Sequence, residues 1–86
     1  MDKKIAVVSA ILEAPVDVQS RFNAIVSEFK EIVRGRTGIP FEQYGVSVIT
    51  IIVVGTMDEI NGMTGKLGNL SGVSVKTSVS KKTIEG

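Results

Sequence analysis

The hydrophobic pattern of the chain is dominated by residues 46–54, a run rich in valine and isoleucine between Gly45 and Gly55. The β-branched composition and the glycine boundaries favour a strand over a helix, and the run is too short to cross a bilayer. Successive side chains of a strand point to opposite faces, and here both faces are apolar. Val46, Val48, Ile52 and Val54 share one face, and Ile49, Ile51 and Val53 share the other. Residues 5–12 have the same two-sided pattern, so we expect two central strands.

A helical period follows the break at residues 13–15. Apolar residues then recur at spacings of four, three and one, as they do along one face of an amphipathic helix. They are Val18, Phe22, Ile25, Val26, Phe29, Ile32 and Val33. Asp17 is suited to cap the start of this helix, and Gly35 is suited to end it.

A second helix is predicted after Thr56, because Thr56 and Glu59 have the spacing of a capping box. Its apolar face contains Ile60, Met63 and Leu67. Glycine recurs at positions 62, 65 and 68, although each glycine inside a helix costs about 1 kcal/mol relative to alanine. Close packing against the sheet or a partner is the favoured explanation, with Gly68 at the helix end. The alternative is backbone that is exposed to a ligand.

Two further segments have the patterns of edge strands. Residues 38–44 contain Pro40, which a central strand does not tolerate. Residues 72–79 alternate between apolar and polar side chains, which leaves one face in water. The ends of the chain, residues 1–2 and 83–86, are predicted to be flexible parts of a single domain that spans residues 1–86.

The order strand, helix, strand, strand, helix, strand is that of the ferredoxin-like βαββαβ fold, which belongs to the α+β class. It predicts a four-stranded antiparallel sheet in the order 4-1-3-2 with both helices on one face. The central positions of this sheet fall to the first and third strands, which are the two strands with apolar side chains on both faces.

The face of the sheet without helices would then expose an apolar patch. Leaving roughly four to six aliphatic side chains in water, at about 1.5 to 3 kcal/mol each, is a large penalty. We therefore expect a homo-oligomer, a dimer or a tetramer, whose subunits meet through sheet faces. The pattern does not decide which face the helices cover, so the expected interface residues come from both faces. They are Val7, Val8, Val48, Ile49, Ile51 and Val53.

The composition excludes several kinds of chemistry. The 86 residues include no cysteine and no histidine, so we expect no disulfide, no thiol nucleophile, no metal and no other cofactor. Lys3 and Lys4 precede an apolar run, as in a secretion signal, but the run ends early at Glu13 and no cleavage site follows. This favours a cytoplasmic location. The net charge of +1 gives no general reason to expect nucleic acid or a membrane as a partner.

In this topology one end of the molecule collects basic side chains beside the positive N-terminus of the second helix. They are Lys3, Lys4, Arg34, Arg36, Lys81 and Lys82. A small anion, such as a phosphate or carboxylate group, is a candidate ligand at this end. Two observations favour an ordinary solvated surface instead: Asp58 and Glu59 lie in the same helical turn, and lysines at strand ends commonly protect sheet edges.

Catalysis and nucleic-acid binding are not favoured. Residues 13–17 lack the arginine- and glycine-rich phosphate cradle of an acylphosphatase, and residues 62–66 lack the glycine spacing of a P-loop. The two central strands carry no aromatic side chains on which RNA bases could stack. We therefore expect neither an enzyme nor a protein that contacts nucleic acid directly.

Four segments of the chain, at residues 35–40, 45–49, 55–60 and 64–73, resemble a small family of regulators assigned to the iron-only hydrogenase system. The resemblance covers nearly the whole chain, and Thr64-Gly65-Lys66-Leu67-Gly68 is its most specific part. This family is similar to ACT domains and to the C-terminal domain of nickel-responsive repressors. The resemblance implies a ferredoxin-like fold, a dimer or tetramer and a regulatory role, with no catalytic residues. Nickel repressors bind metal through histidine and cysteine, so metal sensing is not implied for this chain.

The resemblance and the charge pattern lead to a functional hypothesis. We expect a small-molecule-sensing regulatory domain that acts as a homo-oligomer. We also expect this domain to regulate transcription through a DNA-binding partner protein, because it has no DNA-binding module of its own. The expected ligand is an amino acid or another small anionic molecule. The candidate ligand-binding residues are Arg34, Arg36, Thr56, Thr64, Gly65 and Lys66. The alternative is a structural or interaction protein that assembles through its sheet face and binds a partner protein without a small ligand.

Overall fold

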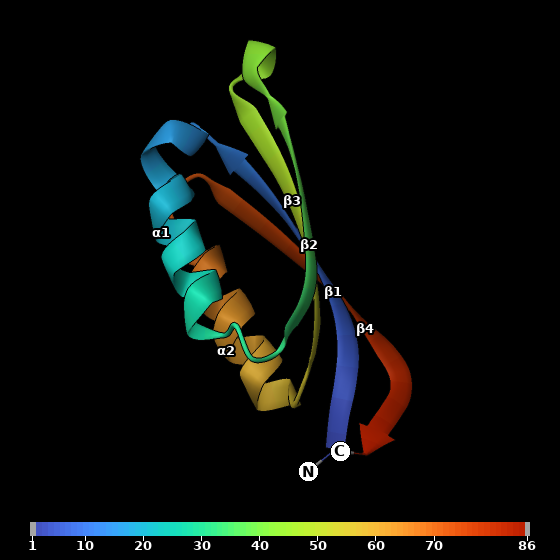
Figure 1. Cartoon of the computed structure of the whole chain (residues 1–86). Helices are drawn as coiled ribbons and strands as arrows, with labels where there is room; N and C mark the ends of the chain where they lie inside the picture. Colours follow the sequence, from blue (N-terminus) through green and yellow to red (C-terminus); the bar gives the residue numbers. More distant parts are fainter. Residues whose placement is uncertain (1, 86) are drawn as a thin grey trace.

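A computed structural model describes residues 2–85 and shows two layers, a sheet and a pair of helices packed against it (Figure 1). The elements follow one another as β1 (Asp2–Glu13), α1 (Pro15–Glu28), β2 (Val33–Phe41), the 3-10 helix η1 (Glu42–Tyr44), β3 (Val46–Gly55), α2 (Met57–Gly68) and β4 (Val73–Glu85). The molecule is elongated, with extents of 43, 18 and 16 Å.

The four strands form one antiparallel sheet in the order β2-β3-β1-β4. This is the predicted order, read from the opposite edge. Both helices lie on the same side of the sheet, and the other side carries no helix (Figure 1). The ferredoxin-like fold is therefore confirmed, and β1 and β3 occupy the central positions that their two-sided apolar pattern predicts.

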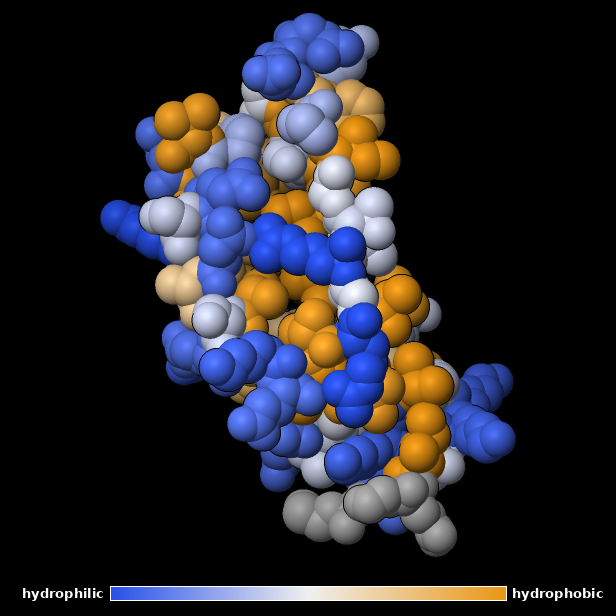
Figure 2. Space-filling view, viewed as in Figure 1, coloured by the Kyte–Doolittle hydropathy of each residue, from blue (hydrophilic) through white to orange (hydrophobic). Residues whose placement is uncertain are grey.

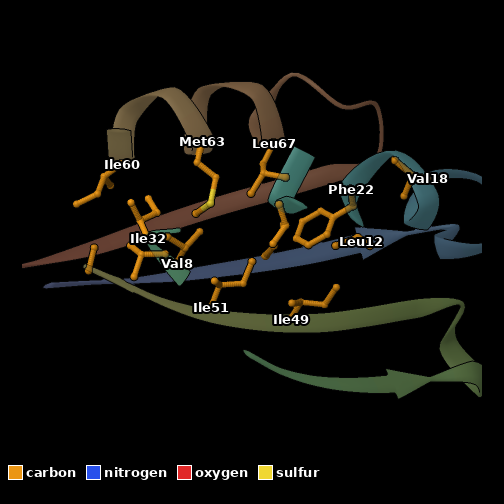
Figure 3. Packing of buried hydrophobic residues seen from close by; sticks show 14 residues of the cluster. Val8, Leu12, Val18, Phe22, Ile32, Ile49, Ile51, Ile60, Met63 and Leu67 are labelled. Carbon is orange, nitrogen blue, oxygen red and sulfur yellow. The ribbon is translucent and has the colours of Figure 1, made fainter. Parts of the chain in front are cut away.

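The core lies between the sheet and the helices, as the close view in Figure 3 shows. Alternate residues of β1 and β3 point toward the helices, and both helices contribute apolar side chains to the same layer. The buried residues are Ala6, Val8, Ala10, Leu12, Val18, Phe22, Val26, Ile32, Ile49, Ile51, Val53, Ile60, Met63 and Leu67. Ser47 lies on this face of β3 and is 6% exposed. One face of each central strand is thus covered by the chain itself.

The opposite side of the sheet, which we call the open face, keeps large apolar side chains in contact with solvent. Ile5, Val7, Ile11 and Ile52 are 40, 37, 46 and 43% exposed, and Ile39 on β2 is 52% exposed. In Figure 2 apolar surface follows the side of the molecule opposite the helices, interrupted by polar patches. The chain therefore has one covered and one uncovered apolar face on its two central strands.

Helix α1 differs from its prediction at both ends. It begins at Pro15, after Ala14 with φ of 52°, so Asp17 lies in the first turn and Ala14 occupies the N-cap position without a side-chain hydrogen bond. Proline suits this first position because its missing N–H has no partner there in any helix. The helix ends at Glu28, and Ile32 belongs to the turn that follows. Ile32 is 6% exposed because the turn also faces the core. The apolar pattern of the helix therefore continues in the sequence past the residue at which the helix itself ends.

The two edge strands are longer than predicted. β2 begins at Val33 rather than at residue 38, and residues 42–44 form η1 instead of continuing the strand. β4 continues to Glu85, so residues 83–85, predicted to be frayed, belong to the sheet, as does Asp2 at the start of β1. Residues 1 and 86 lie outside the described residues. The β1–β4 register shifts between Lys4 and Ala6, where the extension of β4 begins to pair with the start of β1.

Candidate functional site

The N-terminus of α2 is closed by the capping box that the sequence predicts. The Thr56 hydroxyl oxygen accepts the Glu59 N–H at 3.2 Å, and Oε1 of Glu59 accepts the Thr56 N–H at 2.8 Å. The pKa of Glu59 is lowered from its ordinary value of 4.5, and the largest cause is the hydrogen bond from the Thr56 backbone N–H. The Thr56 hydroxyl and, more weakly, the charge of Lys3 also lower this pKa, whereas desolvation raises it. The helix therefore holds a carboxylate of its own at its positive end.

A shallow cleft of about 320 Å³ lies beside this helix end. It is lined by Asp2, Lys4, Thr56, Met57, Asp58 and Thr83. Lys4 also donates from Nζ to the backbone oxygen of Lys81 at 3.0 Å. The cleft thus combines two carboxylates with one ammonium group, and the ammonium already has an acceptor. This charge balance does not favour an anion.

The two arginines of the predicted ligand site make contacts within the chain. Nη1 of Arg34 donates to the backbone oxygen of Glu31 at 3.0 Å. Nη2 of Arg36 donates to Oδ1 of Asn23 at 2.6 Å, and the Arg36 guanidinium lies 5.6 Å from the centroid of the Phe22 ring. Arg36 therefore connects β2 to α1, which is a structural use of the side chain.

The Thr64-Gly65-Lys66 segment lies late in α2, away from the capped end. Nζ of Lys66 contacts Oε1 of Glu28 at 2.6 Å and lies 5.8 Å from the centroid of the Phe29 ring. The Thr64 hydroxyl donates to the backbone oxygen of Asn61 at 3.4 Å. Lys66 therefore links α2 to α1. The six predicted ligand-binding residues are spread over β2 and both ends of α2 and do not form one cluster.

The helical glycines have different surroundings. A Cβ atom added at Gly62 would lie 3.4 Å from the ring of Phe29, whereas added Cβ atoms at Gly65 and Gly68 would meet nothing within 4 Å. Close packing therefore accounts for Gly62 only. Gly55, which the sequence analysis identifies only as the boundary of a strand, is the tightest glycine near α2: a Cβ at Gly55 would lie 3.0 Å from Ile32 and 3.1 Å from Oε1 of Glu59.

The six predicted interface residues divide between the two faces of the sheet. Val8, Ile49, Ile51 and Val53 are at most 1% exposed beneath the chain's own helices, so they are not available to a second subunit. The register places Val7 beside Ile52 and Val48 beside Ile11 on the open face. Ile5, Ile11 and Ile52 complete this surface and were missing from the prediction. The signal that separates the faces is weak: Ser9 and Thr50 mark the open face, but Ser47 lies on the covered one.

Two other clefts lie elsewhere on the molecule. One of about 390 Å³ follows the end of α1 and is lined mostly by residues 28–32 together with Glu59. The other, of about 380 Å³, lies where the β1–α1 connection meets the β2–β3 hairpin. Its lining is apolar apart from Glu42 and comprises Ala14, Pro15, Val16, Pro40, Glu42, Gly45 and Val46.

The described residues contain no group of three or more histidine, cysteine, aspartate or glutamate side chains placed to hold a metal ion. No helix among them is both long enough and apolar enough to cross a membrane.

Comparison with solved structures identifies chains with the same fold. The uncharacterised protein TM1266 from Thermotoga maritima has a TM-score of 0.88 and 28% identity, over 92% of this chain and 99% of its own. The PII-like protein CPII from Thiomonas intermedia K12, solved with ADP, AMP and bicarbonate, has a TM-score of 0.53 and 13% identity over 100 and 98% of the two chains. SnoaB, a cofactor-independent oxygenase from Streptomyces nogalater, has a TM-score of 0.51 and 11% identity over 94 and 92%.

At such low identities, CPII and SnoaB share only the fold with this chain, and the fold serves both signalling and catalysis. No match was found among the curated proteins. A family model described as "Iron-only hydrogenase system regulator, putative" matches residues 4–77, which is most of the chain. The resemblance seen in the sequence is thereby confirmed, and the chain belongs to the TM1266-like family of iron-only hydrogenase system regulators.

Proposed function

We propose that this chain is a cytoplasmic, non-catalytic regulatory protein that works as a homo-oligomer assembled through the open face of its sheet. The observation that carries the proposal is the exposure of Ile5, Val7, Ile11 and Ile52 on two adjacent central strands. Each is about 40% exposed. Burying that exposed part would contribute roughly 0.6 to 1.2 kcal/mol of hydrophobic free energy per side chain, which folding of a single chain does not provide. Covering all four would contribute about 2.5 to 5 kcal/mol per copy.

Membership of a regulator family supports the regulatory role. Within the proposal, a small molecule such as an amino acid or another anionic ligand binds between subunits and shifts their assembly, because a ligand moves an equilibrium by its difference in affinity for the two states. CPII, a protein of similar fold that was solved with ADP, AMP and bicarbonate, supports a small anionic ligand as a candidate. Any effect on transcription would pass through a DNA-binding partner protein.

A second candidate function is assembly and protein binding without a small ligand. It is favoured by the contacts at the predicted ligand site, where Arg36 is engaged by Asn23, Lys66 by Glu28 and Thr56 by Glu59. A ligand that used these groups would first have to displace contacts within the chain.

Native mass spectrometry of the purified protein tests the assembly and any retained ligand in one measurement. We expect a dimer or tetramer for the natural chain and a monomer for Ile52→Lys, which places a charge at the centre of the open face. Val16→Lys is the matched control, because Val16 is 96% exposed on α1 and lies on the helix side of the molecule. A natural chain that is monomeric at micromolar concentration contradicts the proposal.

A thermal-shift screen separates the two candidate functions. Amino acids, ADP, AMP and bicarbonate are added at increasing concentration, and a ligand present at ten times its Kd should raise Tm by about 5 °C or more. Such a shift supports ligand sensing. An oligomer with no shift for any compound supports the second candidate.

A further inference from the structure

A row of polar side chains crosses the apolar open face at right angles to the strands. The register pairs Thr37 with Thr50, Thr50 with Ser9, and Ser9 with Lys76. These four residues therefore lie side by side on β2, β3, β1 and β4, the order in which the strands form the sheet. We call this row the polar row.

The rows on either side of the polar row have apolar centres. One contains Ile52 beside Val7, with Gly35 and Ser78 at its ends. The other contains Val48 beside Ile11, with Ile39 and Ser74 at its ends. Across these three rows Lys76 is the only charged residue, and it lies on an edge strand.

The size of this face fits a second copy of the chain. Four strands spaced about 4.8 Å apart and about ten residues long project over roughly 500 to 600 Å². The accessible surface of such a face exceeds its projection and approaches the value of about 800 Å² that each partner buries in a standard interface. Serine and threonine hydroxyls both donate and accept hydrogen bonds, so a polar row can pair with an identical row.

The charge of Lys76 selects one arrangement of the two copies. When identical faces meet with their strands aligned, as in most sheet sandwiches, the twofold axis lies between the sheets and runs either along the strands or along the polar row. An axis along the polar row places Lys76 opposite the partner's Lys76, and like charges repel. An axis along the strands exchanges the two edges, so that Lys76 lies opposite the partner's Thr37 and Ser9 lies opposite the partner's Thr50.

We propose that two copies pair through their open faces about a twofold axis parallel to the strands, with the two polar rows in contact and reversed relative to each other. This inference rests on the proposed function and adds the orientation of the subunits. The hydroxyl of Thr37 then accepts from the ammonium group of the partner's Lys76, while the apolar rows on either side pack against their own copies.

Charge variants at the two ends of the polar row test this arrangement by sedimentation equilibrium. Thr37→Lys places two ammonium groups opposite each other and should weaken association by about tenfold or more. The double variant Thr37→Lys with Lys76→Glu should recover most of the loss, because opposite charges then meet. Thr37→Glu should tighten association about threefold or more. Ser20→Lys, on the helix side, adds the same charge as Thr37→Lys away from the face and should leave association unchanged.

The alternative axis predicts a different pattern. It places each of the two positions opposite itself, so the double variant would exchange one pair of like charges for another and recover none of the loss, and Thr37→Glu would weaken association. Either result in a natural chain that is oligomeric overturns the arrangement and leaves the proposed function in place. A natural chain that is monomeric overturns both. Circular dichroism of each variant establishes that the sheet is intact.

Discussion

At the scale of single residues, Gly55, Thr56 and Glu59 together determine how β3 passes into α2. Oε1 of Glu59 reaches back to the Thr56 N–H, and the space it occupies exists because Gly55 has no side chain. The Thr56 hydroxyl accepts the Glu59 N–H in return. The capping box is thus a three-residue arrangement that depends on glycine at position 55.

Removal of the Thr56 hydroxyl should destabilise the fold without altering the sheet. We expect Thr56→Ala to lower the free energy of unfolding by about 1 kcal/mol, the usual cost of losing an N-cap side chain. Thr56→Ser keeps the hydroxyl and should retain most of the stability. Urea denaturation followed by circular dichroism measures both, and equal losses for the two variants would contradict the role of the hydroxyl.

The lowered pKa of Glu59 predicts a pH-dependent contribution to stability. The folded pKa lies below the ordinary value of 4.5, so the contribution is present above pH 4.5 and is lost as the pH falls through the folded value. The difference in unfolding free energy between the natural chain and Glu59→Gln should therefore be largest at neutral pH and should decrease in acid. Urea denaturation across this pH range checks it. A difference that stays constant would show that Glu59 acts without its charge.

Substitution by alanine should change the stability of the chain in opposite directions at two of its glycines. Gly65→Ala should stabilise the chain by about 1 kcal/mol, because the helix gains a better former and the added Cβ meets nothing within 4 Å. Gly72→Ala should destabilise it by at least about 1 kcal/mol, because its φ is +81° and the Cβ would lie 3.0 Å from the Glu13 carbonyl oxygen. Thermal denaturation measures both, and a Gly65→Ala variant that gains stability but loses ligand response would favour a binding role at Gly65.

At the scale of elements, β3 shows how one strand serves two surfaces. Ile51 is fully buried beneath the helices, whereas Ile52 on the opposite face is 43% exposed. β1 divides in the same way, with Val8 in the core and Val7 on the open face. The helices therefore use only half of the apolar side chains that these strands present.

This division predicts different costs at adjacent positions of β3. Ile51→Ala should lower the free energy of unfolding by about 2 to 5 kcal/mol, since it leaves a cavity in the core. Ile52→Ala should cost the isolated subunit only about 1 kcal/mol, because the side chain is 43% exposed there. Urea denaturation extrapolated to low protein concentration, where subunit contacts contribute nothing, makes the comparison. Equal costs at the two positions would mean that the chain itself covers both faces.

Most of the fold follows from the sequence because the element types differ in their hydrophobic period. β1 and β3 are recognisable as central strands, and the spacing of Thr56 and Glu59 locates the start of α2 correctly. The end of α1 does not follow in this way. Ile32 continues the helical spacing but lies in a turn, and it is buried for the same reason as the helix face that precedes it.

The candidate site is less predictable from the sequence because its side chains find partners far along the chain. Arg36 pairs with Asn23, and Lys66 pairs with Glu28, which is 38 positions away. No local pattern marks such partners. A sequence shows which side chains are charged, but only the packing of α1 against α2 and β2 shows that these charges are already engaged.

At the scale of the whole molecule, the proposed assembly through the open face would make the thermal stability depend on protein concentration. A subunit contact that forms only between folded chains stabilises the folded state by mass action. We expect the Tm of the natural chain to rise over a hundredfold increase in protein concentration, and the Tm of Ile52→Lys to stay constant. Calorimetry at several concentrations measures this. A constant Tm for the natural chain, at concentrations that span its dissociation, would contradict the contact.

The placement of both helices on one side of the sheet has a consequence for how such an assembly would communicate (Figure 1). Two copies joined by their open faces turn their helical layers outward, in opposite directions. A protein that recognises the assembly would then find α1 and α2 of both copies exposed, whereas the centre of the contact between the copies would be covered. Mutations in the outward-facing helical layer would thus affect recognition by another protein, and mutations in the open face would affect self-association.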